Sequence, residues 1–339
     1  MKQNYFIQKN NFTKLLENFS RQYHVYTPTG ETEYCWQSYS GVFEFNKYRP
    51  ISSLRQFFTP SRESIHTYFS HNSKIKKPFC IVGAKNCDLA SLAIHDFVFL
   101  EGTTDTHYQT MRNNNFIISS DCTGYKNVCF CLALGINPYP EKSFDFNLSP
   151  VSGGYIVMVG SPKGELAITN NKDLFKAVDD NHILEQTKKR EDIVKNLTAY
   201  LKSQQLADKD ALYNLVKDGY ENAVWPQEAL RCVECGACIM NCPTCHCFLL
   251  CDSGHTTTYV RAKIWDGCQY KNFTRVAGGA NPLKLRQQRL RNRYVKKFEF
   301  FPDNIKTYAC TGCGRCIESC PAKIDIREVF KQLAIKTPA

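Results

Sequence analysis

The stretch CVECGACIMNCP (residues 232–243) recurs near the end of the chain as CTGCGRCIESCP (residues 310–321). Both runs have the spacing C-x2-C-x2-C-x3-C-P, with which bacterial ferredoxins hold [4Fe–4S] clusters through cysteine thiolates. In that arrangement the fourth cysteine of each run binds the cluster of the other run. We therefore predict two [4Fe–4S] clusters with crossed ligands, one held by Cys232, Cys235, Cys238 and Cys320 and the other by Cys310, Cys313, Cys316 and Cys242.

A glycine follows the second cysteine of each run, at Gly236 and Gly314. A tight loop around a cluster needs a positive φ or a close backbone approach at such a position, and glycine allows both. Zinc sites with four cysteines also use C-x2-C knuckles, so a zinc-binding module that recognises nucleic acid is the alternative interpretation. Two complete runs that both end in Cys-Pro favour clusters over zinc.

The composition indicates a metal-binding protein of the cytoplasm. The chain has 339 residues, of which 43% are apolar, which is enough for about two domains with hydrophobic cores. Its 18 cysteines would suggest disulfides in a secreted protein, but the first residues, MKQNYFIQKNNF, contain no apolar signal segment. No apolar run approaches the length of about eighteen residues that a membrane span needs, so we expect no membrane insertion. The formal net charge of +11 is compatible with an acidic partner protein, an anionic surface or nucleic acid, and does not choose among them.

Strand and helix patterns alternate in the first half of the chain. Residues 79–85 and 116–122 are apolar runs typical of buried strands, and the residues between them begin with a helical pattern over 87–100. This order predicts a parallel α/β unit. We also expect a helix over residues 6–23, a loop over 47–64, and a hairpin over 153–169 with its turn at residues 162–164.

The composition changes at about residue 172. From there to residue 225 the chain is highly charged, poor in glycine and proline, and periodic in apolar residues, which predicts two or three helices. The predicted fold class is α+β, with an N-terminal mixed α/β domain followed by a mainly helical dicluster ferredoxin-type domain. The predicted boundaries are residues 1–170 for the first domain, 171–224 for a helical connector and 225–339 for the ferredoxin-type domain.

Four further cysteines predict a third metal centre in the N-terminal domain. Cys87 and Cys122 follow the two buried strands, and ligand sites of parallel sheets gather at the carboxyl ends of their strands. Cys129 and Cys131 form a C-x-C pair shortly afterwards. We expect these four thiols to meet and to hold another iron–sulfur cluster. The alternatives are a zinc site and ordinary burial, because cysteine is also a small, often buried apolar residue.

The 67 residues between the two runs, 243–309, contain four more cysteines, whose spacing is irregular. A metal centre needs four converging ligands, so we expect these thiols to tune the clusters or to pack beside them rather than to bind metal. They are Cys245, Cys247, Cys251 and Cys268.

A basic segment, KLRQQRLRNRYVKK (residues 284–297), precedes the second run. One interpretation is a solvated helix face whose long side chains extend into water. The other is a docking surface for an acidic partner, with Arg289 as an exposed charge at its rim. No aromatic stacking stripe and no recognition motif accompanies the segment, so we expect no nucleic acid partner.

Five motifs, GAKNCDLASL, CFCLALG, RCVECGACIMNCPTCHCF, KIWDGC and CTGCGRCIESCP, together resemble those of one known family. It comprises the iron–sulfur subunits of cytosolic sulfhydrogenases (the beta subunit) and of anaerobic sulfite reductases, and the motifs occur in the family's order over nearly the whole chain. The resemblance implies an electron-transfer subunit that works between a flavin-containing subunit, which oxidises NAD(P)H, and a catalytic subunit. It also implies cluster ligation by the four cysteines of the N-terminal domain and an α-helical arrangement of the ferredoxin-type domain.

No motif of catalysis accompanies these cysteines. The chain contains no dinucleotide-binding GxGxxG, no P-loop, no nucleophile elbow and no evident acid–base pair. A non-catalytic electron carrier is therefore the favoured interpretation, and reduction of a small substrate at a cluster with an open coordination position is a further alternative.

Overall fold

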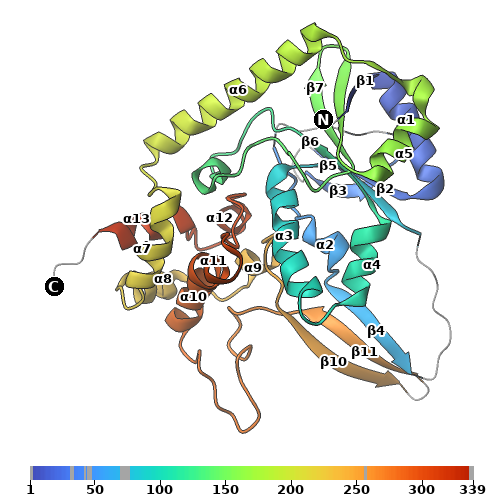
Figure 1. The fold of residues 1–339 in the computed structure, drawn as a ribbon. Coiled ribbons are helices and arrows are strands. Elements are labelled where there is room, and N and C mark those ends of the chain that lie inside the picture. Colours follow the sequence, from blue (N-terminus) through green and yellow to red (C-terminus); the bar gives the residue numbers. More distant parts are fainter. Residues whose placement is uncertain are drawn as a thin grey trace.

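The computed structural model describes residues 3–30, 34–41, 43, 48–68, 77–255 and 258–335. In Figure 1 a large sheet with helices on both faces lies at one end of the molecule, and a small sheet projects from the opposite end. The helices that carry the two cysteine runs lie beside both. The predicted α+β fold class is confirmed. None of the described helices is both long enough and apolar enough to cross a membrane.

The large sheet has eight strands in the order β3-β2-β5-β6-β7-β8-β1-β9. Strands β2, β5, β6 and β7 run parallel to their neighbours in this group, and the other pairs are antiparallel. The parallel pair β5–β6 is the predicted α/β unit, with the helix α3 (Asn86–Leu100) between its strands. The strands are β1 (Asn4–Gln8), β2 (His24–Thr29), β3 (Cys35–Ser38), β5 (Phe79–Ala84), β6 (Phe116–Ser120), β7 (Phe146–Val151), β8 (Gly154–Val159) and β9 (Phe175–Ala177).

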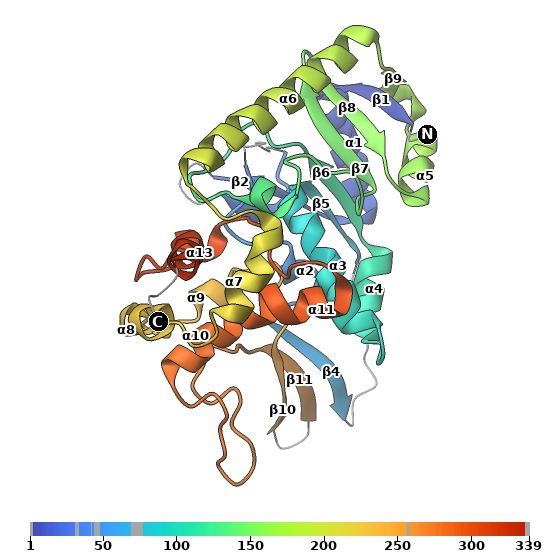
Figure 2. The same cartoon turned by 60° about the vertical axis from the view of Figure 1, so that its left-hand side comes forward.

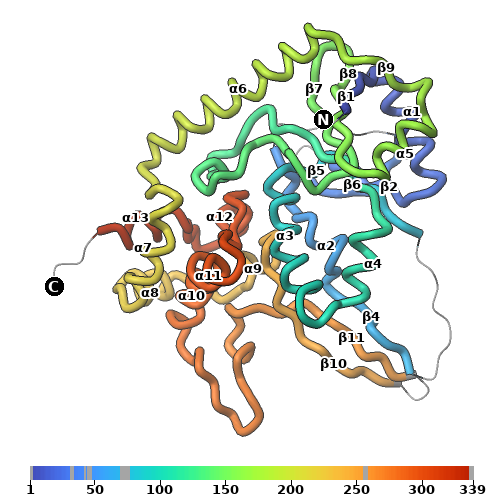
Figure 3. The backbone as a smooth tube through the Cα atoms, viewed as in Figure 1, coloured from blue at the N-terminus to red at the C-terminus, as the bar shows by residue number. Residues whose placement is uncertain are grey.

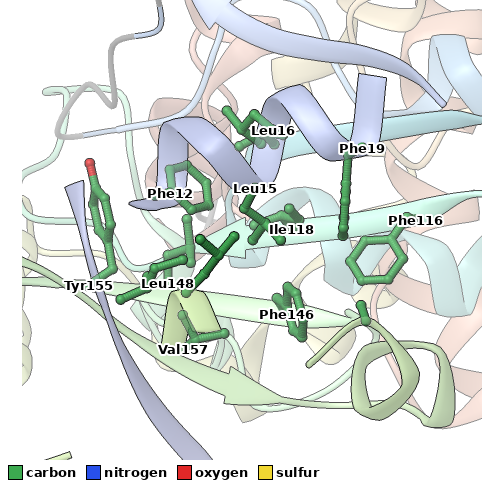
Figure 4. Packing of buried hydrophobic residues seen from close by; sticks show 14 of the residues in the cluster. Phe12, Leu15, Leu16, Phe19, Phe116, Ile118, Phe146, Leu148, Tyr155 and Val157 are labelled. Atoms are coloured by element: carbon green, nitrogen blue, oxygen red, sulfur yellow. The ribbon is translucent and has the colours of Figure 1, made fainter. Parts of the chain in front are cut away.

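Helices cover both faces of this sheet because apolar side chains leave the central strands in both directions. One face packs against α1 (Lys9–Gln22) and α5 (Pro162–Asn170), and Figure 4 shows Phe12 and Phe19 of α1 over Phe116 and Phe146 of the sheet. The other face packs against α2 (Arg55–Phe58), α3 and α4 (Thr106–Asn114). Because β5 and β6 are parallel neighbours, their carboxyl ends lie at the same edge of the sheet, where α3 begins.

The hairpin predicted over residues 153–169 is wrong. Residues 162–170 form the helix α5, because the Ser161 side chain accepts a hydrogen bond from the Gly164 N–H at 3.1 Å and Pro162 occupies the first turn. A serine followed by proline is a typical start of a helix. The prediction instead interpreted Pro162 and Gly164 as parts of a turn. The hairpin lies one strand earlier, where β7 pairs with β8.

Two other boundaries also differ from the prediction. The first helix begins at Lys9, because residues 4–8 form β1 in the large sheet. The predicted loop over residues 47–64 contains α2 and the start of β4 (Arg62–Tyr68). Both strands pair with segments that are far away in the sequence, so local pattern gave no indication of them.

The small sheet joins distant parts of the chain. Its order is β10-β11-β4, in which β10 (Phe248–His255) and β11 (Thr258–Trp265) form a hairpin within the gap between the two cysteine runs. The buried Lys263 of β11 makes ion pairs with Glu63 of β4 at 2.8 Å and with Asp105 at the start of α4 at 2.7 Å. The gap between the runs thus holds a structural element that fastens it to the N-terminal part.

The third part of the molecule is helical. Figures 2 and 3 show the long helix α6 running from the large sheet to α7, in the predicted helical stretch. Its Leu197 and Leu201 pack in one core with Trp225, Tyr294 and Phe330. The helices are α6 (Asp180–Ser203), α7 (Leu212–Asp218), α8 (Val224–Arg231), α9 (Ala237–Met240), α10 (Arg286–Val295), α11 (Phe301–Ile305), α12 (Arg315–Glu318) and α13 (Ile326–Ala334).

Two buried side chains of α3 join the large sheet to the cysteine runs. Asp88 accepts a hydrogen bond from Arg315 of α12 at 2.9 Å, in an ion pair that is almost inaccessible to solvent. His95 Nε2 lies 2.9 Å from the carbonyl oxygen of Pro243, which ends the first run. Burial, with the nearby charges of His246 and Arg55, lowers the pKa of His95 to about 3. The imidazole is therefore neutral, and its Nε2–H donates to the carbonyl.

Candidate metal centres

The four cysteines predicted for the third centre line one cavity. Cys87 is the second residue of α3, directly after β5, and Cys122 follows the end of β6 by two residues. Since β5 and β6 are parallel neighbours, both thiols emerge at the same edge of the sheet. Cys129 and Cys131 reach the same cavity from the loop after β6. We call the set Cys87, Cys122, Cys129 and Cys131 the third centre.

A second cavity gathers three cysteines of the first run and two of the second, Cys316 and Cys320. Cys232, Cys235 and Cys238 line it together with Cys320, which begins a turn after α12. Gly236 and Gly314 both have a positive φ, 74° and 71°, and each is the residue before the short helix that carries the third cysteine of its run. We call the set Cys232, Cys235, Cys238 and Cys320 the first centre.

The remaining four cysteines of the two runs also lie near one another. Cys310 is close enough to Cys316 and Cys242 for their charges to affect its pKa. Cys316 is likewise close to Cys242 and Cys313. Cys242 thus leaves its own run and lies with the second one. We call the set Cys310, Cys313, Cys316 and Cys242 the second centre.

The second centre lies between the other two. Cys316 lines the cavity of the first centre together with Cys238. Cys313 lines the cavity of the third centre, within electrostatic range of Cys87 and Cys129. The second centre therefore adjoins both of the others.

Burial favours the protonated form of several of these thiols, whereas the hydrogen bond from Cys245 and the nearby Lys297 hold the pKa of Cys242 well below its ordinary value. Burial raises the pKa of Cys122, Cys238 and Cys310 to about 12. The nearby cations Lys85, Arg293 and Lys297, respectively, act in the opposite direction and only reduce this increase. A nucleophilic or redox-active thiol needs a low pKa and access to solvent, so the arrangement does not suit thiol chemistry. It suits metal binding, because coordination deprotonates a buried thiol.

Buried cations lie beside each centre, and within the described part of the chain Lys297 and Lys85 form no ion pair with a carboxylate, although the charge of Asp121 also raises the pKa of Lys85. Lys297 is 6% exposed, and its ammonium contacts Cys242 Sγ at 3.5 Å and two neutral oxygens, of Thr244 and Ala309. Lys85 is 1% exposed beside Cys87 and Cys122, and it donates to Ser120 Oγ and to the Asp121 carbonyl, both at 2.8 Å. A buried cation without a counter-charge costs several kcal/mol, roughly 3–5 by mutational measurement. Negative charge held by the cysteines would remove that cost.

Arg293 lies between the first and second centres. It is 5% exposed, lines the cavity of the first centre, and is within electrostatic range of both Cys238 and Cys316. Its Nη2 is 3.5 Å from the Cys238 carbonyl oxygen, and its buried Nε has no hydrogen-bond partner among the described residues. An unpaired buried donor facing a cysteine-lined cavity fits an anionic group in that cavity.

The prediction that Arg289 is an exposed rim charge is wrong. Its side chain is 3% exposed and donates to the carbonyl oxygens of Gln269, Leu283 and Lys284, and to the Glu234 carboxylate. Residues 289, 293 and 297 are all basic and all buried, so this part of the basic segment is neither a solvated face nor a nucleic acid surface. Their spacing of four residues places all three on one side of a helix, but the sequence alone does not show that this side is buried.

The additional cysteines of the gap lie beside the predicted ligands. Cys245 is within hydrogen-bond reach of Cys242, and Cys268 is within electrostatic range of Cys238 and Cys247. Cys251 is on β10, in the small sheet. Among the residues that the structure describes, no three Cys, His, Asp or Glu side chains are close enough together to hold a single metal ion.

Comparison with known proteins shows which family the chain is similar to. Residues 231–324 match the family described as a 4Fe-4S dicluster domain. Over 261 residues the chain is 34% identical to sulfhydrogenase 2 subunit beta of Pyrococcus furiosus, which covers 75% of this chain and 74% of the relative. Both findings identify an iron–sulfur electron-transfer subunit that carries [4Fe–4S] clusters. The chain therefore belongs to the family of iron–sulfur subunits that includes the sulfhydrogenase beta subunit.

Proposed function

We propose that the chain relays electrons between a flavin-containing subunit, which oxidises NAD(P)H, and a catalytic subunit of hydrogenase or sulfite reductase type. The first, second and third centres each hold one [4Fe–4S] cluster, through the twelve cysteines named above. When bound, such a cluster accepts and releases single electrons. The protein supplies the rest: thiolate ligands, burial, and cations that stabilise added negative charge.

The observation that carries this proposal is a set of buried cations that form no ion pair with any carboxylate of the described residues. Lys85, Arg293 and Lys297 lie against cysteines of the third, first and second centres. Burial by itself lowers the pKa of Lys297, but the charges of Cys242 and Cys245 raise it above the ordinary value, so the ammonium stays protonated. Four thiolates around a cluster give each cation the counter-charge that neutral thiols do not supply.

The pattern of the cysteines supports clusters over zinc. Both runs have the complete spacing C-x2-C-x2-C-x3-C-P with which ferredoxins hold [4Fe–4S] clusters. Residues 231–324 also match a 4Fe-4S dicluster domain.

The same geometry supports one order of transfer and one compartment. Because the second centre lies between the other two, an electron entering at the first centre would leave at the third, or the reverse. None of the 18 cysteines forms a disulfide, as is usual in the reducing cytoplasm, where we place the protein.

Iron analysis tests the number of clusters. Protein purified without oxygen is expected to contain about twelve irons and about twelve labile sulfides per chain. Its brown colour should bleach with dithionite, and EPR of the reduced protein should show interacting clusters. About eight irons would mean that the third centre holds no cluster, and zinc without iron would reject the proposal.

Replacing Arg293 by glutamine is expected to lower the reduction potentials of the first and second centres. The substitution removes a buried positive charge beside Cys238 and Cys316, and reduction adds negative charge there. We expect the equilibrium constant for reduction to fall about tenfold, which is about 59 mV for a one-electron couple. A redox titration followed by EPR measures this. The matched control is Arg261→Gln, at an arginine that is 47% exposed in the small sheet; equal potentials in the two variants, at full iron content, would contradict the role of Arg293.

A further inference from the structure

The two cysteine runs present equivalent residues to very different surroundings. In the second run, Thr311 and Cys313 are 3% and 8% exposed. At the equivalent positions of the first run, Val233 is 63% exposed and Cys235 is also exposed. The backbone is similar in both, since the residue between each pair has a positive φ, 63° at Gly312 and 56° at Glu234.

The second run is covered by the loop that carries the third centre. The Phe130 N–H donates to the Gly312 carbonyl oxygen at 2.8 Å. The packing is so close that a Cβ on Gly312 would lie 2.5 Å from the Cys131 nitrogen, and one on Gly314 would lie 2.2 Å from the Val128 oxygen. Within this chain, therefore, this face of a cysteine run is the surface against which the next metal-binding loop packs.

The first run leaves the corresponding face open in the described part of the chain. Leu230 and Val233, on either side of Cys232, are 84% and 63% exposed. The neighbouring Gly236 is approached by the Tyr270 hydroxyl, which covers one edge and leaves Val233 and Cys235 exposed. Glu234 has a left-handed backbone conformation that costs a non-glycine residue about 1–3 kcal/mol, and its carboxylate pairs with Arg289 and Arg286. The Glu234 side chain is thus held by two arginines, while its neighbours Val233 and Cys235 remain at the surface.

The rim of this face is basic. Arg231 is half exposed and donates to the carbonyl oxygens of Ala322 and Lys323, so the exposed Lys323 lies beside it. Arg286 is 43% exposed on the other side, next to Glu234. The carboxylate nearest to Arg231, that of Glu228, is buried. An apolar centre with a cationic rim is complementary to a partner with an apolar centre and an acidic rim.

We propose that an acidic electron-transfer protein docks on the open face of Leu230, Val233 and Cys235. It would cover the first run in the same way as the loop of residues 128–131 covers the second run. This inference rests on the proposed function, because it takes the first centre to be the end of the electron path. The partner places its redox group against Cys235, where a cluster ligand reaches the surface. Arg231, Arg286 and Lys323 attract its acidic rim.

Reduction of an acidic haem protein tests this surface. The probe is the soluble domain of cytochrome b5, which is acidic, and the comparison probe is cytochrome c, which is basic. Full-length protein is reduced with dithionite, freed of excess reductant, and mixed with each probe in a stopped-flow instrument at low and high salt. We expect Val233→Asp and Leu230→Asp each to slow the reduction of cytochrome b5 about tenfold at low salt, because the new charge repels the acidic rim. Reduction of cytochrome c should not slow.

A matched control and a small mediator separate docking from cluster loss. Leu166→Asp alters a side chain that is 61% exposed on α5, away from both runs, and should change neither rate. Methyl viologen, which needs no protein surface, should exchange electrons equally fast with every variant. Equal cytochrome b5 rates for wild type and both variants would overturn the proposal, as would equal slowing by Leu166→Asp. A wild-type dimer that both variants abolish, with unchanged cytochrome rates, would assign the face to a second copy of the chain and overturn it too. Iron-free protein would instead refute the proposed function.

Discussion

Replacing Cys313 by alanine is expected to remove about four irons per chain and to stop electron transfer between the first and third centres. Cys313 is 8% exposed in the second run, and it lies within electrostatic range of Cys87 and Cys129. Loss of its thiolate leaves the second centre with three cysteines. Because that centre lies between the other two, the path is broken at its middle. In the assembled complex, NAD(P)H-driven turnover should fall to background.

Iron analysis and EPR of the dithionite-reduced protein measure this effect directly. The EPR spectrum should lose the broadening that comes from neighbouring reduced clusters, because the cluster that adjoins both of the others is missing. Cys35→Ala is the matched control, since Cys35 is in β3 and outside all three centres, and it should keep full iron and full turnover. Full turnover by Cys313→Ala with one cluster missing would contradict the place of the second centre in the path.

The spacing of the cysteines gave the clearest information about the candidate centres. The pattern C-x2-C-x2-C-x3-C-P indicated which residues of the two runs belong together, and the structure brings Cys320 to the first run and Cys242 to the second. The strand-end rule brought Cys87 and Cys122 to one cavity, because parallel neighbouring strands end at the same edge. In both cases a local sequence pattern could be combined with a known geometric rule: crossed ligation for the two runs, and the shared edge of parallel strands for Cys87 and Cys122. Ligation by all twelve cysteines, and the division at residues 170 and 224, stay predictions.

The buried cations were not predicted, because burial depends on contacts distant in the sequence. The segment with Arg289, Arg293 and Lys297 has the composition of a surface helix, and only its packing against the cysteine runs makes these three side chains internal. The pairing of β4 with β11 joins residues that are about 200 positions apart. Local propensity contains no information about such pairs. The prediction from local sequence also placed Ser161 beside a turn, whereas this residue caps the helix α5.

Replacing Arg315 by methionine is expected to lower the free energy of unfolding by about 3–5 kcal/mol. Arg315 and Asp88 are 1% and 0% exposed, and their Nη2 and Oδ2 atoms are 2.9 Å apart. The guanidinium also donates to the carbonyl oxygens of Pro50, Ile51 and Ser52, so one side chain joins the second cysteine run, α3 and the segment before α2. Methionine fills much of the space but leaves a carboxylate and three carbonyls without their donor. Urea unfolding of the anaerobically prepared protein should show the loss as a lower midpoint.

Two further variants separate the unpaired charge from the loss of packing. In the double variant Arg315→Met/Asp88→Asn the residue at position 88 is neutral and can still accept the Leu54 N–H, which lies 3.2 Å from Asp88 Oδ1 in the native chain. If the buried carboxylate causes the instability, this double variant should be more stable than Arg315→Met alone. Arg261→Met breaks an ion pair with Asp252 whose two side chains are 47% and 58% exposed, and it should cost less than about 1 kcal/mol. A double variant less stable than Arg315→Met would show that the paired carboxylate is not the source of the penalty, and the connection between the sheet and the second run would then depend on the carbonyl contacts of Arg315.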